Sequence, residues 1–99
     1  MVQVTVFVPA ALRQYAAGER KVRVEVDGDE PPTVGHVFSC LHKTAPGVVE
    51  RALDECGEVR PHVNVFVDGE LVRVGLRLGL DTPVAEGAEV WILPAVSGG

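Results

Sequence analysis

Three stretches of the chain alternate strictly between valine and other residues. Every second position of residues 2–8 (VQVTVFV) is valine, and residues 21–26 (KVRVEV) and 62–67 (HVNVFV) repeat the pattern. Alternation with a period of two is typical of a β-strand that buries one face. The other face of residues 21–26 is charged, which favours a position at the edge of a sheet. The pattern therefore predicts three strands with valine-rich inner faces.

Between the second and third stretches the apolar period changes to that of a helix. A single apolar stripe predicts a helix buried along one side, and Thr33 in front of it is a good N-cap. We expect Pro46 and Gly47 to end this helix, with another turn or two in residues 48–53 and a short helical turn near residues 9–16. The stripe consists of Val34, Val37, Phe38, Leu41 and Ala45.

The remaining pattern predicts a hairpin and a last strand. Asp68-Gly69 is a strong two-residue hairpin signal, so residues 70–74 should return as a fourth strand. A loop over residues 75–88 then leads to the fifth and most apolar strand, Glu89–Pro94. We expect an α+β domain over residues 1–93, followed by a flexible tail over residues 94–99.

The order of these elements predicts how they assemble. One main helix covers one face of a mixed five-stranded sheet. The first two strands are expected to be antiparallel neighbours, and the last strand should lie centrally beside the first. This is the β-grasp layout of ubiquitin-like proteins.

Composition and charge narrow the functional classes. The 99 residues make one domain, and the net charge of −5 with scattered basic residues argues against nucleic acid as a partner. No apolar run is long enough to span a membrane, and Met1 leads straight into alternating valines rather than a signal peptide. Cys40 and Cys56 are then expected to be reduced thiols in the cytoplasm.

The histidines and cysteines are the candidates for a metal site or a catalytic nucleophile. His36 and Cys40 lie four residues apart on the predicted helix, and His42 and His62 are further candidates. Zinc sites usually have paired short spacings, which this chain lacks, and an iron–sulfur cluster needs four cysteines. A Cys–His nucleophile would need an orienting third group. We expect no metal and no catalytic pair, with His36 and Cys40 on the solvated side of the helix.

Four large apolar residues are predicted on the face of the sheet that the helix leaves open. Because the first, third and fifth strands are expected to be neighbours, these residues would form one patch. Exposed apolar patches with aromatic residues usually mark protein interfaces. The alternative is that the loop of residues 74–88 folds over Trp91 as a small second core. The predicted patch consists of Phe7, Phe66, Trp91 and Leu93.

The sequence closes on Gly98-Gly99. Backbone without side chains can thread a narrow channel that any Cβ would block, and six residues from Pro94 extend at most about 20 Å. The α-carboxylate of Gly99 would then be the reactive group. A disordered end without function is the alternative. The residues predicted to pass through a partner's active site are Pro94, Ala95, Val96, Ser97 and Gly98.

Over nearly its full length the chain resembles the ubiquitin-like sulfur carriers of the ThiS/MoaD family, and its tail resembles their CysO branch. The stretches that carry this resemblance are VTVFVPAALRQYA, the helix from Thr33 to Leu41, APGVVERAL, VNVFVDGELV, EGAEVWILPAV and the final Gly-Gly.

The resemblance implies a carrier and not a free-standing enzyme. In such families an E1-like enzyme adenylates the terminal carboxylate, here that of Gly99, with ATP and Mg²⁺. A sulfur donor then displaces AMP and leaves a thiocarboxylate, whose sulfur a second, biosynthetic enzyme delivers to cysteine, a cofactor or another metabolite. The carrier itself holds no permanent cofactor.

Three other readings of the sequence stay open at this point. The chain could be the small subunit of molybdopterin synthase, with its tail held in a large catalytic subunit. It could be a protein modifier that forms isopeptide bonds to lysines. It could also be a β-grasp binding module whose terminal glycines are accidental.

Overall fold

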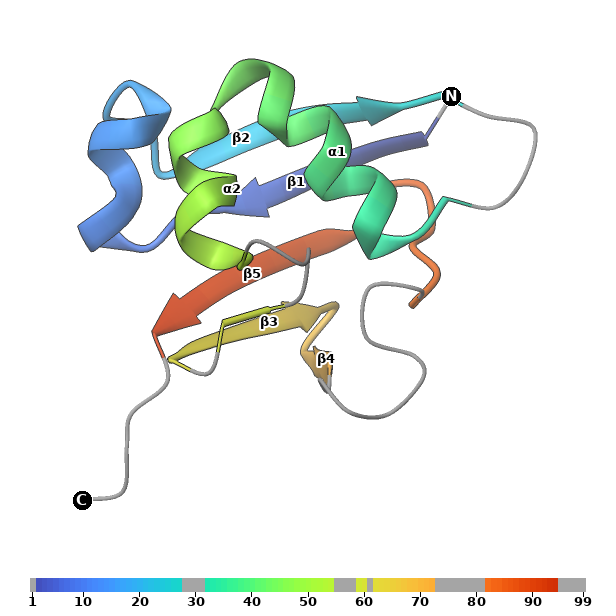
Figure 1. Cartoon of the computed structure of the whole chain (residues 1–99). Coiled ribbons are helices and arrows are strands. Elements are labelled where there is room, and N and C mark those ends of the chain that lie inside the picture. The colour runs from blue at the N-terminus through green and yellow to red at the C-terminus, as the bar shows by residue number, and fades with distance from the viewer. Residues whose placement is uncertain (1, 28–31, 55–58, 61, 73–81, 95–99) are drawn as a thin grey trace.

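Two helices lie on one face of a twisted sheet in the computed structural model of the chain (Figure 1). The structure describes residues 2–27, 32–54, 59–60, 62–72 and 82–94. Its elements are β1 (Val2–Phe7), the 3₁₀ helix η1 (Ala10–Ala16), β2 (Lys21–Val26), α1 (Val34–Thr44), α2 (Pro46–Ala52), β3 (Val63–Val67), β4 (Glu70–Val72) and β5 (Glu89–Pro94).

The sheet has five strands in the order β2-β1-β5-β3-β4. β1 and β2 are antiparallel, β1 and β5 are parallel, and β3 is antiparallel to both β5 and β4. The last strand therefore lies at the centre beside the first, and the charged strand β2 lies at an edge. The β-grasp arrangement expected from the order of the elements is confirmed.

The core lies between the sheet and the two helices. Val4, Val6 and Val8 are buried as the alternation predicts, whereas Val2 and Val22 are only half-buried and pack at its margin. All members of the α1 stripe, which are Val34, Val37, Phe38, Leu41 and Ala45, are buried.

The helices lie close to their predicted ranges, and the main difference is that α2 begins at Pro46 and not at residue 48. Pro46 does not merely end α1, because it is also the first residue of α2, a position where a fixed φ suits a helix and the missing N–H costs nothing. The expected helical turn after Pro9 is a 3₁₀ helix of seven residues. The first strand ends at Phe7 and the third begins at Val63, each one residue inside its predicted bounds.

The predicted hairpin between β3 and β4 is present. Asp68 and Gly69 have φ values of 49° and 87°, the left-handed conformation that a tight hairpin turn requires. The Asp68 carboxylate also accepts a hydrogen bond of 2.9 Å from the backbone N–H of Glu89, which ties the turn to β5. The last two residues of the predicted fourth strand, 73 and 74, lie outside the described residues.

Candidate functional site

Three aromatic residues form a continuous row across the face of the sheet opposite the helices. In the strand register Phe7 of β1 and Phe66 of β3 are both paired with Trp91 of β5. The rings of Phe7 and Trp91 are stacked, with centroids 3.9 Å apart and planes within 3°. Figure 1 shows that both α-helices lie on the other side of the sheet. The prediction that these three residues lie side by side on neighbouring strands is confirmed.

The row continues onto the neighbouring strand through a residue that the sequence analysis missed. Leu71 of β4 is paired with Phe66 and is 42% exposed. The hairpin signal Asp68-Gly69 could have revealed it, because a two-residue turn fixes which residues of the two strands are opposite each other. Leu93 of β5 is paired with Asn64 of β3, beside this row.

The patch is accessible to a partner. Trp91 and Leu93 are 37% and 38% exposed, and Phe7 and Phe66 are half-buried. Large apolar side chains in one exposed row are typical of a protein-binding surface. We call Phe7, Phe66, Leu71, Trp91 and Leu93 the aromatic face.

The alternative, in which the loop of residues 74–88 covers Trp91, receives no support from the described part of that loop. Val84 and Ala88 are buried in the main core, and Pro83 forms a bridge with Thr33 at the start of α1. This segment therefore packs beside α1. The other part of the loop, residues 74–81, lies outside the described residues.

The tail starts at the end of the central strand. Pro94, which the sequence analysis assigned to the tail, is the last residue of β5 and is paired with Val63. Its side chain is exposed. Ala95, Val96, Ser97, Gly98 and Gly99 lie outside the described residues.

His36 has a structural role that its residue type did not suggest. Its Nδ1 accepts a hydrogen bond of 3.1 Å from the backbone N–H of Thr33, while its own N–H donates to Thr33 Oγ1 at 3.3 Å. These reciprocal bonds form a capping box, in which the third helical residue is usually Glu or Gln. The predicted cap at Thr33 is confirmed, and an imidazole nitrogen completes it.

The other metal and nucleophile candidates are Cys40, His42 and His62. Cys40 is half-buried and packs against the core, so its predicted solvated position is wrong. His42 and His62 are exposed on different elements. Among the described residues no group of three or more His, Cys, Asp or Glu side chains could hold a metal ion.

A helix that crosses a membrane must be long and apolar. Within the part of the chain that the structure describes, every helix is too short or too polar to cross a bilayer.

Known proteins resemble this chain over almost its whole length. Residues 6–99 match the ThiS family. The sulfur carrier protein CysO of Mycobacterium tuberculosis is 39% identical over 98 residues, which cover 97% of this chain and 98% of the relative. Small archaeal modifier protein 1 of Haloferax volcanii is 39% identical over 83 residues, or 84% and 86% of the two chains.

Solved structures agree with this relationship. The crystal structure of M. tuberculosis CysO has a TM-score of 0.77 at 39% identity and covers 94% of this chain and 99% of its own. A chain in the BexX/CysO complex of Amycolatopsis orientalis has a TM-score of 0.77 at 35% identity and covers 97% and 99%. The match over residues 6–99 and the near-complete coverage of both chains lead to one assignment: the chain belongs to the ThiS family.

Proposed function

We propose that this protein is a sulfur carrier whose reactive group is the α-carboxylate of Gly99. The observation that carries the proposal is the family match, which extends through residue 99 and so includes the two final glycines. The aligned relative named a sulfur carrier protein covers 97% of this chain. The position of Pro94 supports it, because this residue ends the central strand of the sheet only five positions before Gly99.

The chemistry begins with activation of a poor electrophile. In a partner enzyme, an oxygen of the Gly99 carboxylate attacks the α-phosphorus of ATP, and the bond from that phosphorus to pyrophosphate breaks. A magnesium ion bound with ATP in the partner neutralises the phosphate charge. In the resulting acyl adenylate, AMP is a good leaving group. A hydrosulfide equivalent then attacks the carbonyl carbon, AMP departs, and Gly99 carries a thiocarboxylate.

The protein's own contribution is binding and positioning. The side-chain-free end of Gly98-Gly99 suits a narrow channel in the activating enzyme. The aromatic face offers a partner a row of large apolar side chains at whose core Trp91 stacks on Phe7. We infer that the activating enzyme, and the biosynthetic enzyme that takes the sulfur, bind this face in turn. A CysO relative from A. orientalis has been solved in a complex with BexX, which supports a protein partner for this carrier.

The experiment that tests the proposal is the intact mass of the chain after incubation with ATP, a sulfur donor and the adenylating enzyme of its source organism. We expect the mass to rise by the difference between sulfur and oxygen. Gly99→Ala should reduce loading by about a hundredfold or more, because an added Cβ displaces the carboxyl in its channel. Lys43→Gln, at the exposed end of α1 and outside the tail, is the control and should load normally.

Loading of a chain that lacks Gly99 at the wild-type rate would contradict the proposal. Gly99→Ala and the chain that lacks Gly99 should both keep the wild-type melting temperature, since chain ends contribute little to stability. A change in melting temperature would show that the loss has a structural cause.

A second function, that of a protein modifier, is favoured by one finding. Small archaeal modifier protein 1 of H. volcanii matches this chain at the same 39% identity as CysO. The same activated Gly99 carbonyl would then be attacked by a lysine amine, and AMP would leave as an amide bond forms. Conjugates that survive reductant on a denaturing gel would support this function, and their absence in cells that contain loaded carrier would exclude it.

A further inference from the structure

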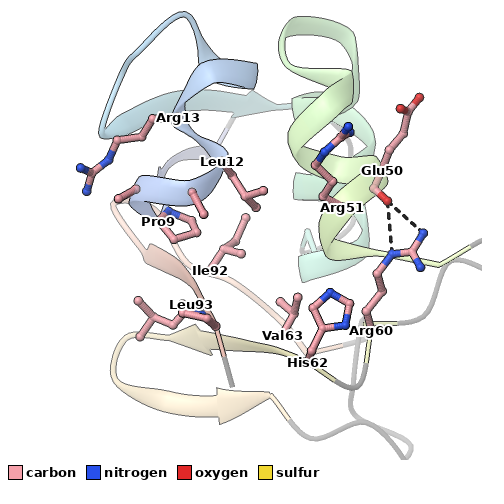
Figure 2. Close-up of a pocket in the computed structure, with 13 residues that line it drawn as sticks. Pro9, Leu12, Arg13, Glu50, Arg51, Arg60, His62, Val63, Ile92 and Leu93 are labelled. Carbon is pink, nitrogen blue, oxygen red and sulfur yellow. Dashed lines mark hydrogen bonds between the residues drawn. The ribbon is translucent and has the colours of Figure 1, made fainter. Parts of the chain in front are cut away.

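A pocket lies where the central strand of the sheet ends. Its cavity volume is about 1030 Å³, and η1, α2, β3 and β5 all contribute to its lining. Figure 2 shows apolar side chains directed into it, which include Leu12 of η1, Val63 of β3 and Ile92 of β5. Pro94 lies at its margin. We call this cavity the β5-end pocket.

The β5-end pocket gathers positive charge on an acidic protein. The whole chain has a net charge of −5, yet the lining contains Arg13, Arg51 and Arg60 against one acidic residue, Glu50. Figure 2 shows the Glu50 carboxylate turned away from the Arg60 guanidinium. A concave surface of one charge sign attracts ligands of the opposite sign. The pocket is therefore suited to carboxylates.

Two of the guanidinium groups are held in place by neutral acceptors. Arg60 donates from Nε and Nη2 to the backbone oxygen of Glu50, at 3.3 and 3.1 Å. Arg51 donates from Nη1 to the backbone oxygen of Gly47 at 3.3 Å, and its Cζ lies 3.7 Å from the centroid of the Tyr15 ring. A guanidinium has five N–H donors, of which these bonds to described residues use two on Arg60 and one on Arg51. Side chains that are already ordered lose less entropy on binding.

The end of β5 has an open side beside this pocket. β1 pairs with β5 only as far as Phe7 opposite Trp91, because the chain turns into η1 at Pro9. β3 continues along β5 to Pro94. Among the described strands, residues 92–94 thus have a neighbour on the β3 side alone. An extended peptide can add to the edge of a strand that has no neighbour, as at β5 beyond the end of β1. This geometry favours a peptide over a compact metabolite as the ligand.

We propose that the β5-end pocket binds an extended acidic segment of the enzyme that activates Gly99. The inference rests on the proposed function, because an enzyme that receives the tail must approach the end of β5 where Pro94 lies. Apolar side chains of the segment pack on Leu12 and Val63, and its carboxylates contact Arg51 and Arg60. Exposed ion pairs are individually weak, so they act mainly on the rate and selectivity of association.

The first test changes charge at Ala11, an exposed residue of η1 that lines the pocket. The variants are Ala11→Lys, Ala11→Gln and Ala11→Glu, whose long side chains differ in charge. Because alanine has only a methyl group, these substitutions remove almost no existing contact. The probe is the adenylating enzyme of the source organism that loads the wild-type chain. The KM for the carrier should rise from Lys to Gln to Glu, by about twofold to fivefold per step at low salt, with kcat unchanged. High salt should reduce the differences.

The second test removes the cations themselves. Arg51→Gln and Arg60→Gln should each raise the KM by about twofold to fivefold. Lys43→Gln, at the exposed end of α1 and outside both the pocket and the aromatic face, is the matched control and should leave the KM unchanged. Melting temperatures identify any variant that fails to fold, and the Ala11 series keeps the inference testable in that case. A photoreactive residue at Ala11 should crosslink to an acidic segment of the enzyme.

Three outcomes would overturn the inference. A KM that is the same for all Ala11 variants, while the wild-type chain is loaded, would refute the pocket and leave the proposed function intact. Charge-dependent self-association in sedimentation, without an effect on KM, would assign the pocket to a second copy of the chain. If no adenylating enzyme of the source organism loads the wild-type chain, the proposed function fails, and this inference fails with it.

Discussion

Replacement of Trp91 by alanine should lower both the stability of the fold and the affinity for the activating enzyme. The loss of affinity should persist at temperatures where the variant is fully folded. Trp91 is 37% exposed and stacks on Phe7 at 3.9 Å. About two thirds of its surface is covered, and full burial of a large apolar side chain contributes about 1.5–3 kcal/mol. The stacked pair adds about 0.5–1.5 kcal/mol. We therefore expect Trp91→Ala to lower the free energy of unfolding by about 2–3 kcal/mol.

Trp91→Ala should also weaken binding to the activating enzyme, apart from its effect on stability. An aromatic residue at the centre of an interface commonly contributes 2 kcal/mol or more, so the dissociation constant for the activating enzyme should rise by about 30-fold. Urea denaturation measures the change in stability, and titration calorimetry on the folded variant measures the change in affinity. The temperature of the titration is set so that all variants are folded.

The neighbouring residue provides the control. Val90 lies on the opposite face of β5, is 0% exposed and does not line the β5-end pocket, so Val90→Ala should cost about 2 kcal/mol of stability. Because its side chain is in the core, affinity for the activating enzyme should stay within about twofold of the wild type. If Trp91→Ala lost stability but bound the enzyme as tightly as Val90→Ala, the aromatic face would be a second core and not a docking surface.

Two further predictions concern stability alone. A Cβ on Gly47 would lie 2.7 Å from Cδ1 and 2.9 Å from Cβ of Tyr15, so overpacking of about 1–3 kcal/mol should outweigh a gain in helix propensity of up to about 1 kcal/mol. Urea denaturation of Gly47→Ala should therefore show net destabilisation, and a variant more stable than the wild type would contradict this packing. Thr33→Ala removes the hydroxyl that caps α1 and should cost about 1 kcal/mol in a thermal unfolding measurement. Thr33→Ser retains the hydroxyl, and equal losses for the two variants would show that the cap with His36 contributes nothing.

Some features of the candidate site could be predicted because they depend on local pattern. Alternation in β1, β3 and β5 assigns Phe7, Phe66 and Trp91 to the outer side of the sheet, since successive side chains of a strand point to opposite faces. The order of the elements then makes these strands neighbours. The tail depends on residue type and position alone, and no feature of the fold is needed to name Gly99.

Other features depend on which distant segments meet. The basic lining of the β5-end pocket comes from η1, α2 and the segment before β3, and no periodicity relates Arg13, Arg51 and Arg60. The same limit applies to His36, which the sequence predicted only to be a solvated residue of the helix and which caps that helix in the structure.

The sequence by itself determined the strands, the start of α1, the hairpin at Asp68-Gly69 and the two faces of the sheet, because strand and helix periods follow from backbone geometry within a few residues. Only the tertiary structure decided that Trp91 stacks flat on Phe7 and that three arginines line the pocket at the end of β5. Such contacts depend on how close-packed elements settle against one another, and that packing is a property of the whole chain.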